Sequence, residues 1–141
     1  MAETALTESQ RATCPKWTEF IPITPTLQQR EFLLLEQLGV LEAFLGGAGG
    51  GGKSLGLLAA GLQYVDQPRY AALIVRSSFA ELSLPGALLD VAREWLRPFL
   101  ASGRVRYSAE LHRYTFPTGA TLSFGFLGCD GDEDRYSGSA F

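Results

Sequence analysis

Apolar residues recur along this chain at spacings typical of alternating strands and helices. Val40–Leu45 is a short, mostly apolar run, which predicts a buried strand. Leu55–Tyr64 is apolar nearly all round and helical in composition, which predicts a buried helix. Tyr70–Val75 predicts a second buried strand, and the helix between them favours a parallel arrangement of the two. The pattern therefore predicts an α/β fold.

Two further helices are expected to flank these elements. Leu27–Leu38 has helical composition, with Thr26 as a plausible N-cap and Gly39 as a natural stop. The other helix opens at Pro85–Gly86 and runs to about Leu100, with its apolar residues at helical spacing.

The last third of the chain has the alternation of short strands. Val105–Tyr107, Arg113–Phe116 and Thr121–Phe126 are the three predicted strands. Pro117–Ala120 supplies a turn between the last two, which predicts an antiparallel β-hairpin. Within Arg113–Phe116 the alternation fits a ribbon that is buried on one face.

Composition favours one globular domain. The 141 residues suffice for one ordinary domain, and 46% hydrophobic against 19% charged residues exclude a disordered chain. A net charge of −3 gives no overall basicity that would indicate nucleic acid. No apolar run approaches the roughly 18 residues of a membrane span, and no secretory signal is recognisable. Cys14 and Cys129 are far apart, which favours reduced thiols in an intracellular protein.

The N-terminus is expected to be a tail. We assign residues 1–20 to a flexible N-terminal tail and residues 21–141 to the domain. Within Lys16–Pro25, apolar residues alternate with prolines, which predicts an extended segment lying against the domain.

The motif Gly47-x-x-x-x-Gly52-Lys53-Ser54 lies between the first predicted strand and its helix, the context that a phosphate-binding loop requires. Glycines let backbone N–H groups surround phosphate oxygens. Lys53 then supplies a charge to the β- and γ-phosphates, and Ser54 offers a hydroxyl to Mg²⁺. The alternative, a flexible glycine linker, is usually flanked by polar sequence. The predicted ATP-binding residues here are Gly47, Ala48, Gly49, Gly50, Gly51, Gly52, Lys53 and Ser54.

Two other residues are candidates whose roles the residues alone leave open. Gln29 carries an amide that can pair with adenine, although a glutamine on a helix surface is the simpler interpretation. Arg76 directly follows the second predicted strand, at the end where ligands bind in open α/β sheets. A phosphate or partner contact and a solvated arginine are equally compatible with that position.

The residues that a phosphate-loop enzyme needs for hydrolysis are not recognisable after Ser54. Phosphate-loop hydrolases use an acidic residue at the end of a later strand to help hold Mg²⁺. Leu127–Asp130 does not match such a strand, because it follows a hairpin and lacks an aliphatic run. Asp130–Asp134 is expected to be a solvated acidic loop, and His112 a surface residue without metal-ligand partners.

An ordered set of motifs resembles the large subunit of tailed-phage terminases. The matching segments are Pro25–Leu33, Gly46–Ser54, Leu62–Asp66, Leu84–Leu88, Tyr114–Ala120 and Arg135–Phe141. The resemblance covers roughly residues 21–141. It implies an incomplete RecA-like P-loop NTPase core, with parallel strands, flanking helices and a C-terminal antiparallel β-hairpin. In that family this ATPase drives viral DNA into a procapsid, and a separate nuclease domain cuts the DNA.

The resemblance also implies roles for single residues. Gln29 matches the adenine-contacting glutamine, Gly47–Ser54 the Walker A loop with Lys53 as a catalytic residue, and Arg135 a possible arginine finger that reaches a neighbouring subunit. ATP and Mg²⁺ are the implied cofactors. The implied partners are double-stranded DNA, the portal protein, the small terminase subunit and further copies in a ring, within the cytoplasm of a bacterial host. Residues 21–141 would end before the Walker B strand and without the nuclease domain.

Other functions remain open on the sequence. The chain is also compatible with another P-loop ATPase of helicase or recombinase type, or with a nucleotide kinase, although a basic substrate lid is lacking. A non-catalytic nucleotide-binding module is the other alternative, because no acidic strand follows the loop. Nucleotide binding with turnover would indicate an enzyme, and binding alone a module.

Overall fold

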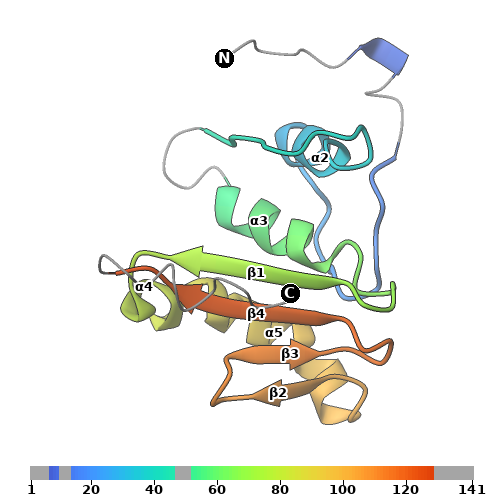
Figure 1. The fold of residues 1–141 in the computed structure, drawn as a ribbon. Coiled ribbons are helices and arrows are strands. Elements are labelled where there is room, and N and C mark those ends of the chain that lie inside the picture. Colours follow the sequence, from blue (N-terminus) through green and yellow to red (C-terminus); the bar gives the residue numbers. More distant parts are fainter. Residues whose placement is uncertain (1–6, 10–13, 47–51, 129–141) are drawn as a thin grey trace.

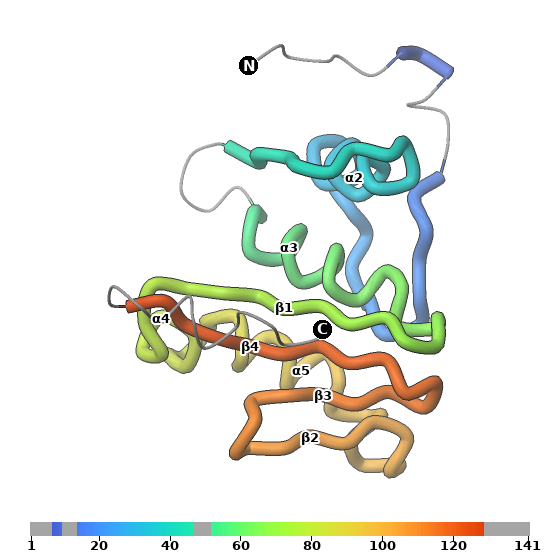
Figure 2. Tube along the Cα trace, in the orientation of Figure 1, coloured from blue at the N-terminus to red at the C-terminus, as the bar shows by residue number. Residues whose placement is uncertain are grey.

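The computed structural model describes residues 7–9, 14–46 and 52–128, and Figures 1 and 2 trace their path. The elements are α2 (Leu27–Leu34), α3 (Lys53–Leu62), β1 (Ala71–Arg76), α4 (Phe79–Ser83), α5 (Leu88–Ala101), β2 (Arg106–Ser108), β3 (Arg113–Thr115) and β4 (Thr121–Phe126). The predicted helices and strands are present, with one exception that concerns Val40–Leu45. None of the helices in these ranges is long and apolar enough to cross a bilayer.

The four strands form one mixed sheet in the order β1-β4-β3-β2. β1 and β4 pair in parallel, with Ala71 opposite Thr121 and Arg76 opposite Phe126. β4 with β3 and β3 with β2 pair antiparallel, which confirms the predicted hairpin. The turn of the hairpin is held by the Thr118 hydroxyl, which donates to the carbonyl of Val65 at 2.6 Å. The fold is therefore α/β.

One face of the sheet carries the core. Ile74 pairs with Phe124, and Tyr114 with Leu122, so these side chains point to the same face. α3 packs closely there, because a Cβ on Gly61 would lie 3.0 Å from Leu122 Cδ1. The apolar stripe of α5 joins the same core with Leu88, Leu89, Ala92 and Leu96. This packing fixes where the first turn of α3 lies relative to the end of β1.

The segment after Lys16 lies against the domain, as predicted. Phe20 is buried, and its ring meets those of Phe99 and Phe116 edge-on at 4.6 and 4.9 Å. The Thr18 hydroxyl donates to the carbonyl of Leu62 at 2.8 Å. The chain is thus packed from about residue 16, so the prediction of a flexible tail is wrong for residues 16–20. Residues 1–6 and 10–13 of the predicted tail lie outside the described residues.

The prediction of a strand at Val40–Leu45 is wrong. This segment has no strand structure, and the side chains of Leu41 and Phe44 are 97% and 86% exposed. The reason lies upstream, where α2 ends at Leu34 and a turn closes at Gly39 with a φ of +75°. The chain then runs along α2 and on the far side of α3 from β1 (Figure 1). The sequence predicted that this run is the parallel partner of the strand at Tyr70–Val75. In the structure that strand is β1, and its parallel partner is β4.

Candidate functional site

The first turn of α3 carries two of the predicted phosphate-loop residues. Gly52 is the N-cap, with a φ of +75° that favours glycine, and its cap has no side-chain hydrogen bond. Lys53 and Ser54 are the first two residues of the ten-residue helix. Gly47, Ala48, Gly49, Gly50 and Gly51 lie outside the described residues. The described end of the motif therefore presents an ammonium and a hydroxyl at a helix N-terminus, where the helix dipole favours anions.

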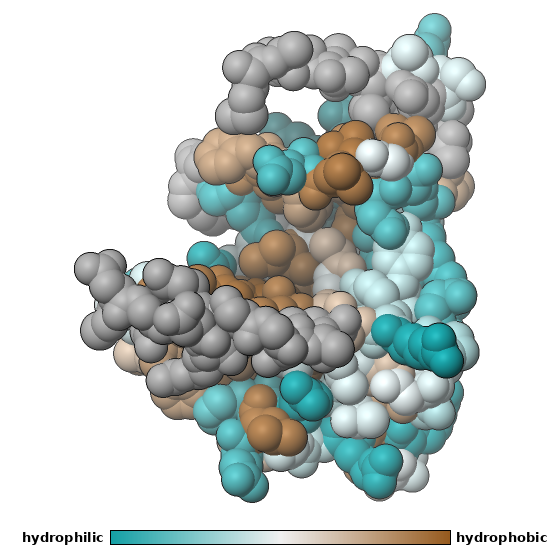
Figure 3. Space-filling view, in the orientation of Figure 1, coloured by the Kyte–Doolittle hydropathy of each residue, from teal (hydrophilic) through white to brown (hydrophobic). Residues whose placement is uncertain are grey.

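A cavity of about 330 Å³ opens beside this turn. Its lining residues are Phe32, Ala43, Phe44, Leu45, Lys53, Ser54, Leu57 and Arg76. One wall is apolar, and Lys53, Ser54 and Arg76 supply the polar groups. Figure 3 shows apolar side chains gathered in the hollow between the α2 layer and the sheet. No carboxylate of the described residues lines this cavity, so its charged lining suits an anion that carries an apolar or aromatic part.

Arg76 reaches this cavity from the sheet. It is the last residue of β1, and its carbonyl accepts a hydrogen bond from the backbone N–H of Leu127 at 2.9 Å. Its Nη2 donates to Ser54 Oγ at 3.3 Å. The sequence left a partner contact and a solvated position equally open for Arg76, and the structure places its guanidinium at the start of α3.

Gln29 lies beside the motif with its amide engaged. The side chain is only 4% exposed. Its Oε1 accepts from the Thr26 N–H at 2.9 Å, and its Nε2 donates to the Gly52 carbonyl at 2.8 Å. The first bond belongs to the capping box of α2 with Thr26 as N-cap, which confirms that predicted cap. An amide has two N–H donors and two oxygen lone pairs, so one of each remains after these bonds.

The remaining predicted site residues divide into two groups. Arg135 and the acidic loop Asp130–Asp134 lie outside the described residues. His112 is half-buried, with its ring 4.7 Å from that of Phe79 and its Nδ1 3.5 Å from the Tyr107 hydroxyl. Within the described ranges no group of three or more His, Cys, Asp or Glu residues is suited to a metal ion.

Ser54 is therefore the described residue to consider for Mg²⁺. Its side chain is exposed at the cavity, and within the described part of the chain its oxygen accepts a hydrogen bond from Arg76. Mg²⁺ in nucleotide sites takes one or two protein ligands and completes its shell with waters and phosphate oxygens. A single accessible hydroxyl next to a cavity lined by Lys53 and Arg76 fits that requirement.

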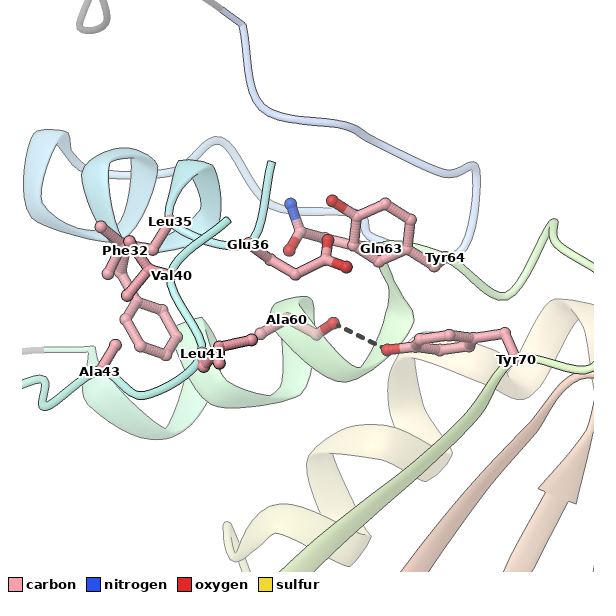
Figure 4. Close-up of a pocket in the computed structure, with 10 residues that line it drawn as sticks. All are labelled: Phe32, Leu35, Glu36, Val40, Leu41, Ala43, Ala60, Gln63, Tyr64 and Tyr70. Carbon is pink, nitrogen blue, oxygen red and sulfur yellow. Dashed lines mark hydrogen bonds between the residues drawn. The ribbon is translucent and has the colours of Figure 1, made fainter. Parts of the chain in front are cut away.

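A second cavity, of about 260 Å³, lies between α2, the segment that follows it, α3 and Tyr70 (Figure 4). Its walls are largely aromatic and aliphatic, and the Tyr70 hydroxyl donates to the Ala60 carbonyl at 3.4 Å. The Tyr64 oxygen is buried without a hydrogen-bond partner among the described residues. Burial and the nearby Glu36 carboxylate raise the pKa of Tyr64. A cavity with a carboxylate and no lysine or arginine in its lining is unsuited to phosphate.

No family model matches this chain, and no curated protein or solved structure matches it. The candidate site consequently rests on two observations, the sequence motif at Gly47–Ser54 and the convergence of Lys53, Ser54 and Arg76 on one cavity. The contact between Arg76 and Ser54 was missed from the sequence. The available signal was an arginine at the carboxyl end of the strand that follows the motif's helix.

Proposed function

We propose that this chain binds ATP with Mg²⁺ at the first turn of α3, as a P-loop nucleotide-binding protein. The observation that carries the proposal is the cavity where Lys53, Ser54 and Arg76 meet at the described end of a complete phosphate-loop motif. The apolar side of the same cavity, with Phe32, accommodates a base or sugar.

Each residue of the proposed site has a role that follows from its chemistry. Lys53 supports the β- and γ-phosphates with a fixed positive charge. Gly52, in a left-handed conformation, lets the backbone turn into the helix without a side chain in the way. Ser54 holds Mg²⁺ through its hydroxyl, and bound Mg²⁺ supplies positive charge that neutralises the phosphate oxygens. Gln29 already bonds Thr26 and Gly52 through its side-chain amide. It contacts adenine with the amide hydrogen and the oxygen lone pair that remain.

The more specific proposal is that the chain is the ATP-binding part of a phage terminase large subunit, the motor that packages viral DNA. It rests on the ordered motifs that resemble that family. Under this proposal the chain acts in the bacterial cytoplasm with double-stranded DNA, the portal protein, the small subunit and other copies of itself. Arg135 would then be the arginine finger offered to a neighbouring copy.

A second function is favoured by one observation. No described carboxylate lines the Lys53 cavity, so the described residues offer no acidic partner for Mg²⁺. A module that binds nucleotide without hydrolysing it is therefore the main alternative, ahead of another P-loop ATPase of helicase or recombinase type.

Two titrations on the full chain separate these functions. Isothermal calorimetry with Mg-ATP measures binding, and phosphate release under the same conditions measures turnover. Saturable, one-to-one binding supports the nucleotide site, whereas no heat at millimolar Mg-ATP contradicts it. Turnover that double-stranded DNA accelerates supports the packaging motor, and binding without turnover in either condition supports the module.

A further inference from the structure

We propose that Arg76 contacts the terminal phosphate of the bound nucleotide and thereby distinguishes a nucleoside triphosphate from a diphosphate. The proposal rests on the proposed nucleotide site and adds to it a residue outside the phosphate-loop motif. It starts from the contact between Arg76 Nη2 and Ser54 Oγ at 3.3 Å.

The backbone of Arg76 is held in place by the neighbouring strand, β4. Its strand pairs with β4 along its whole length, from Ala71 opposite Thr121 to Arg76 opposite Phe126. The carbonyl of Arg76 accepts from Leu127 N–H just beyond the ladder. The backbone of Arg76 is therefore fixed at the end of β1, beside α3, and only the side chain can change its position.

The guanidinium of Arg76 can form more hydrogen bonds than the one that it donates to Ser54. It carries five N–H donors and no acceptor. Its contact in the described part of the chain is to the neutral hydroxyl of Ser54, and no described carboxylate forms an ion pair with it. Lys53 lines the same cavity. An anion with several oxygens can bond the arginine fork with two of them.

The position of Ser54 decides which phosphate Arg76 meets. In the proposed site the Ser54 hydroxyl would hold Mg²⁺, which would supply positive charge to the terminal phosphates. Arg76 donates to that same hydroxyl in the structure, so its guanidinium would lie within reach of the terminal phosphate. Since two positive groups repel each other at one hydroxyl, Arg76 would be released from Ser54 if that oxygen held the metal. Its new partner is the γ-phosphate in a triphosphate, and a diphosphate offers no equivalent group.

A purely structural role for Arg76 predicts a different result. If Arg76 only fixes Ser54, its loss disturbs the metal ligand in every nucleotide complex and weakens ATP and ADP alike. A contact to the terminal phosphate weakens ATP selectively. The ratio of the two affinities therefore separates these roles.

The test compares Arg76→Gln with the wild-type chain and with Arg97→Gln, a matched change at an exposed residue of α5. Dissociation constants for Mg-ATP and Mg-ADP are measured by calorimetry. We expect Arg76→Gln to weaken ATP roughly 10- to 100-fold, as for a lost charge-assisted hydrogen bond, and ADP less than about 3-fold. Arg97→Gln leaves both unchanged. Equal weakening of ATP and ADP, or no weakening, overturns the role of Arg76 while the nucleotide site itself stands. Failure of the wild-type chain to bind either nucleotide overturns the proposed function instead.

A second measurement needs no variant and covers the case in which Arg76→Gln does not fold. Phenylglyoxal modifies accessible arginines, and peptide mass spectrometry reports the modification at Arg76 in the wild-type chain. We expect Mg-ATP to protect Arg76 and Mg-ADP to leave it reactive, with Arg97 equally reactive in both. Equal protection by the two nucleotides contradicts the proposal.

Discussion

The side-chain amide of Gln29 joins the N-termini of two helices. Its Nε2 donates to the carbonyl of Gly52, the N-cap of α3, at 2.8 Å, while its Oε1 accepts from Thr26, the N-cap of α2. The approach is close, since a Cβ on Gly52 would lie 2.6 Å from Gln29 Nε2. One buried residue therefore sets the position of the last glycine of the phosphate-loop motif relative to α2.

Replacement of Gln29 by alanine should destabilise the fold. It removes one half of the capping box and leaves the Gly52 carbonyl without its side-chain donor, at an expected cost of about 1–3 kcal/mol in the free energy of unfolding. Gln28→Ala is the matched control, because Gln28 precedes it on the same helix and is exposed. Urea unfolding followed by circular dichroism gives both values. Equal stability of the two variants would show that these hydrogen bonds contribute nothing net.

The same pair of variants tests the adenine contact. If Gln29 binds adenine, Gln29→Ala weakens ATP by about 1–3 kcal/mol more than it weakens GTP or inorganic tripolyphosphate, borrowing the figure for bidentate base contacts. Gln28→Ala should bind all three ligands like the wild-type chain. A uniform loss across the three ligands would mean that Gln29 acts only through the structure of the motif.

Alkaline pH should destabilise the fold through Tyr114. Burial, with a smaller effect of the neighbouring Tyr107, raises the pKa of Tyr114 to about 12. The unfolded chain releases this proton near pH 10 and the folded chain only near 12. Between these values the unfolded state binds fewer protons, so stability falls as pH rises. Tyr114→Phe should lose less stability than the wild-type chain between pH 9 and 11 in urea unfolding, and parallel losses would contradict this.

Hydrolysis should be negligible even where ATP binds. The described residues around Lys53 provide no carboxylate to help hold Mg²⁺ and none to orient an attacking water. Steady-state phosphate release from the purified chain should therefore equal that of Lys53→Ala. Multiple turnovers that disappear in Lys53→Ala would place a catalytic carboxylate within the chain, and Asp130→Asn and Glu133→Gln would then be the variants to assay.

Local signals in the sequence predicted the elements that local interactions determine. The helix after the motif, the cap at Thr26 and the hairpin around Pro117–Ala120 all follow from spacing and turn chemistry. The alternation in Arg113–Phe116 also identified its buried face, since Tyr114 and Phe116 are buried.

The relationships that the sequence did not predict depend on partners distant in the chain. An apolar run indicates burial but does not specify which strand it pairs with, and β1 pairs with β4 while Val40–Leu45 stays outside the sheet. The contact of Arg76 with Ser54 likewise depends on how α3 lies on the sheet. Gly61 lets α3 approach the Leu122 side chain closely, and no local pattern in the sequence encodes that contact.

The most direct test of the account is the affinity of Lys53→Ala for Mg-ATP. Lys53 is replaced in the full chain, folding is checked by circular dichroism, and Arg97→Ala serves as the control for loss of one exposed positive charge on α5. We predict that calorimetry shows ATP binding weakened roughly 100-fold or more by Lys53→Ala, because the charge against the phosphates is lost, and unchanged by Arg97→Ala. A folded Lys53→Ala chain that binds Mg-ATP as tightly as the wild-type chain would contradict a nucleotide site at the start of α3.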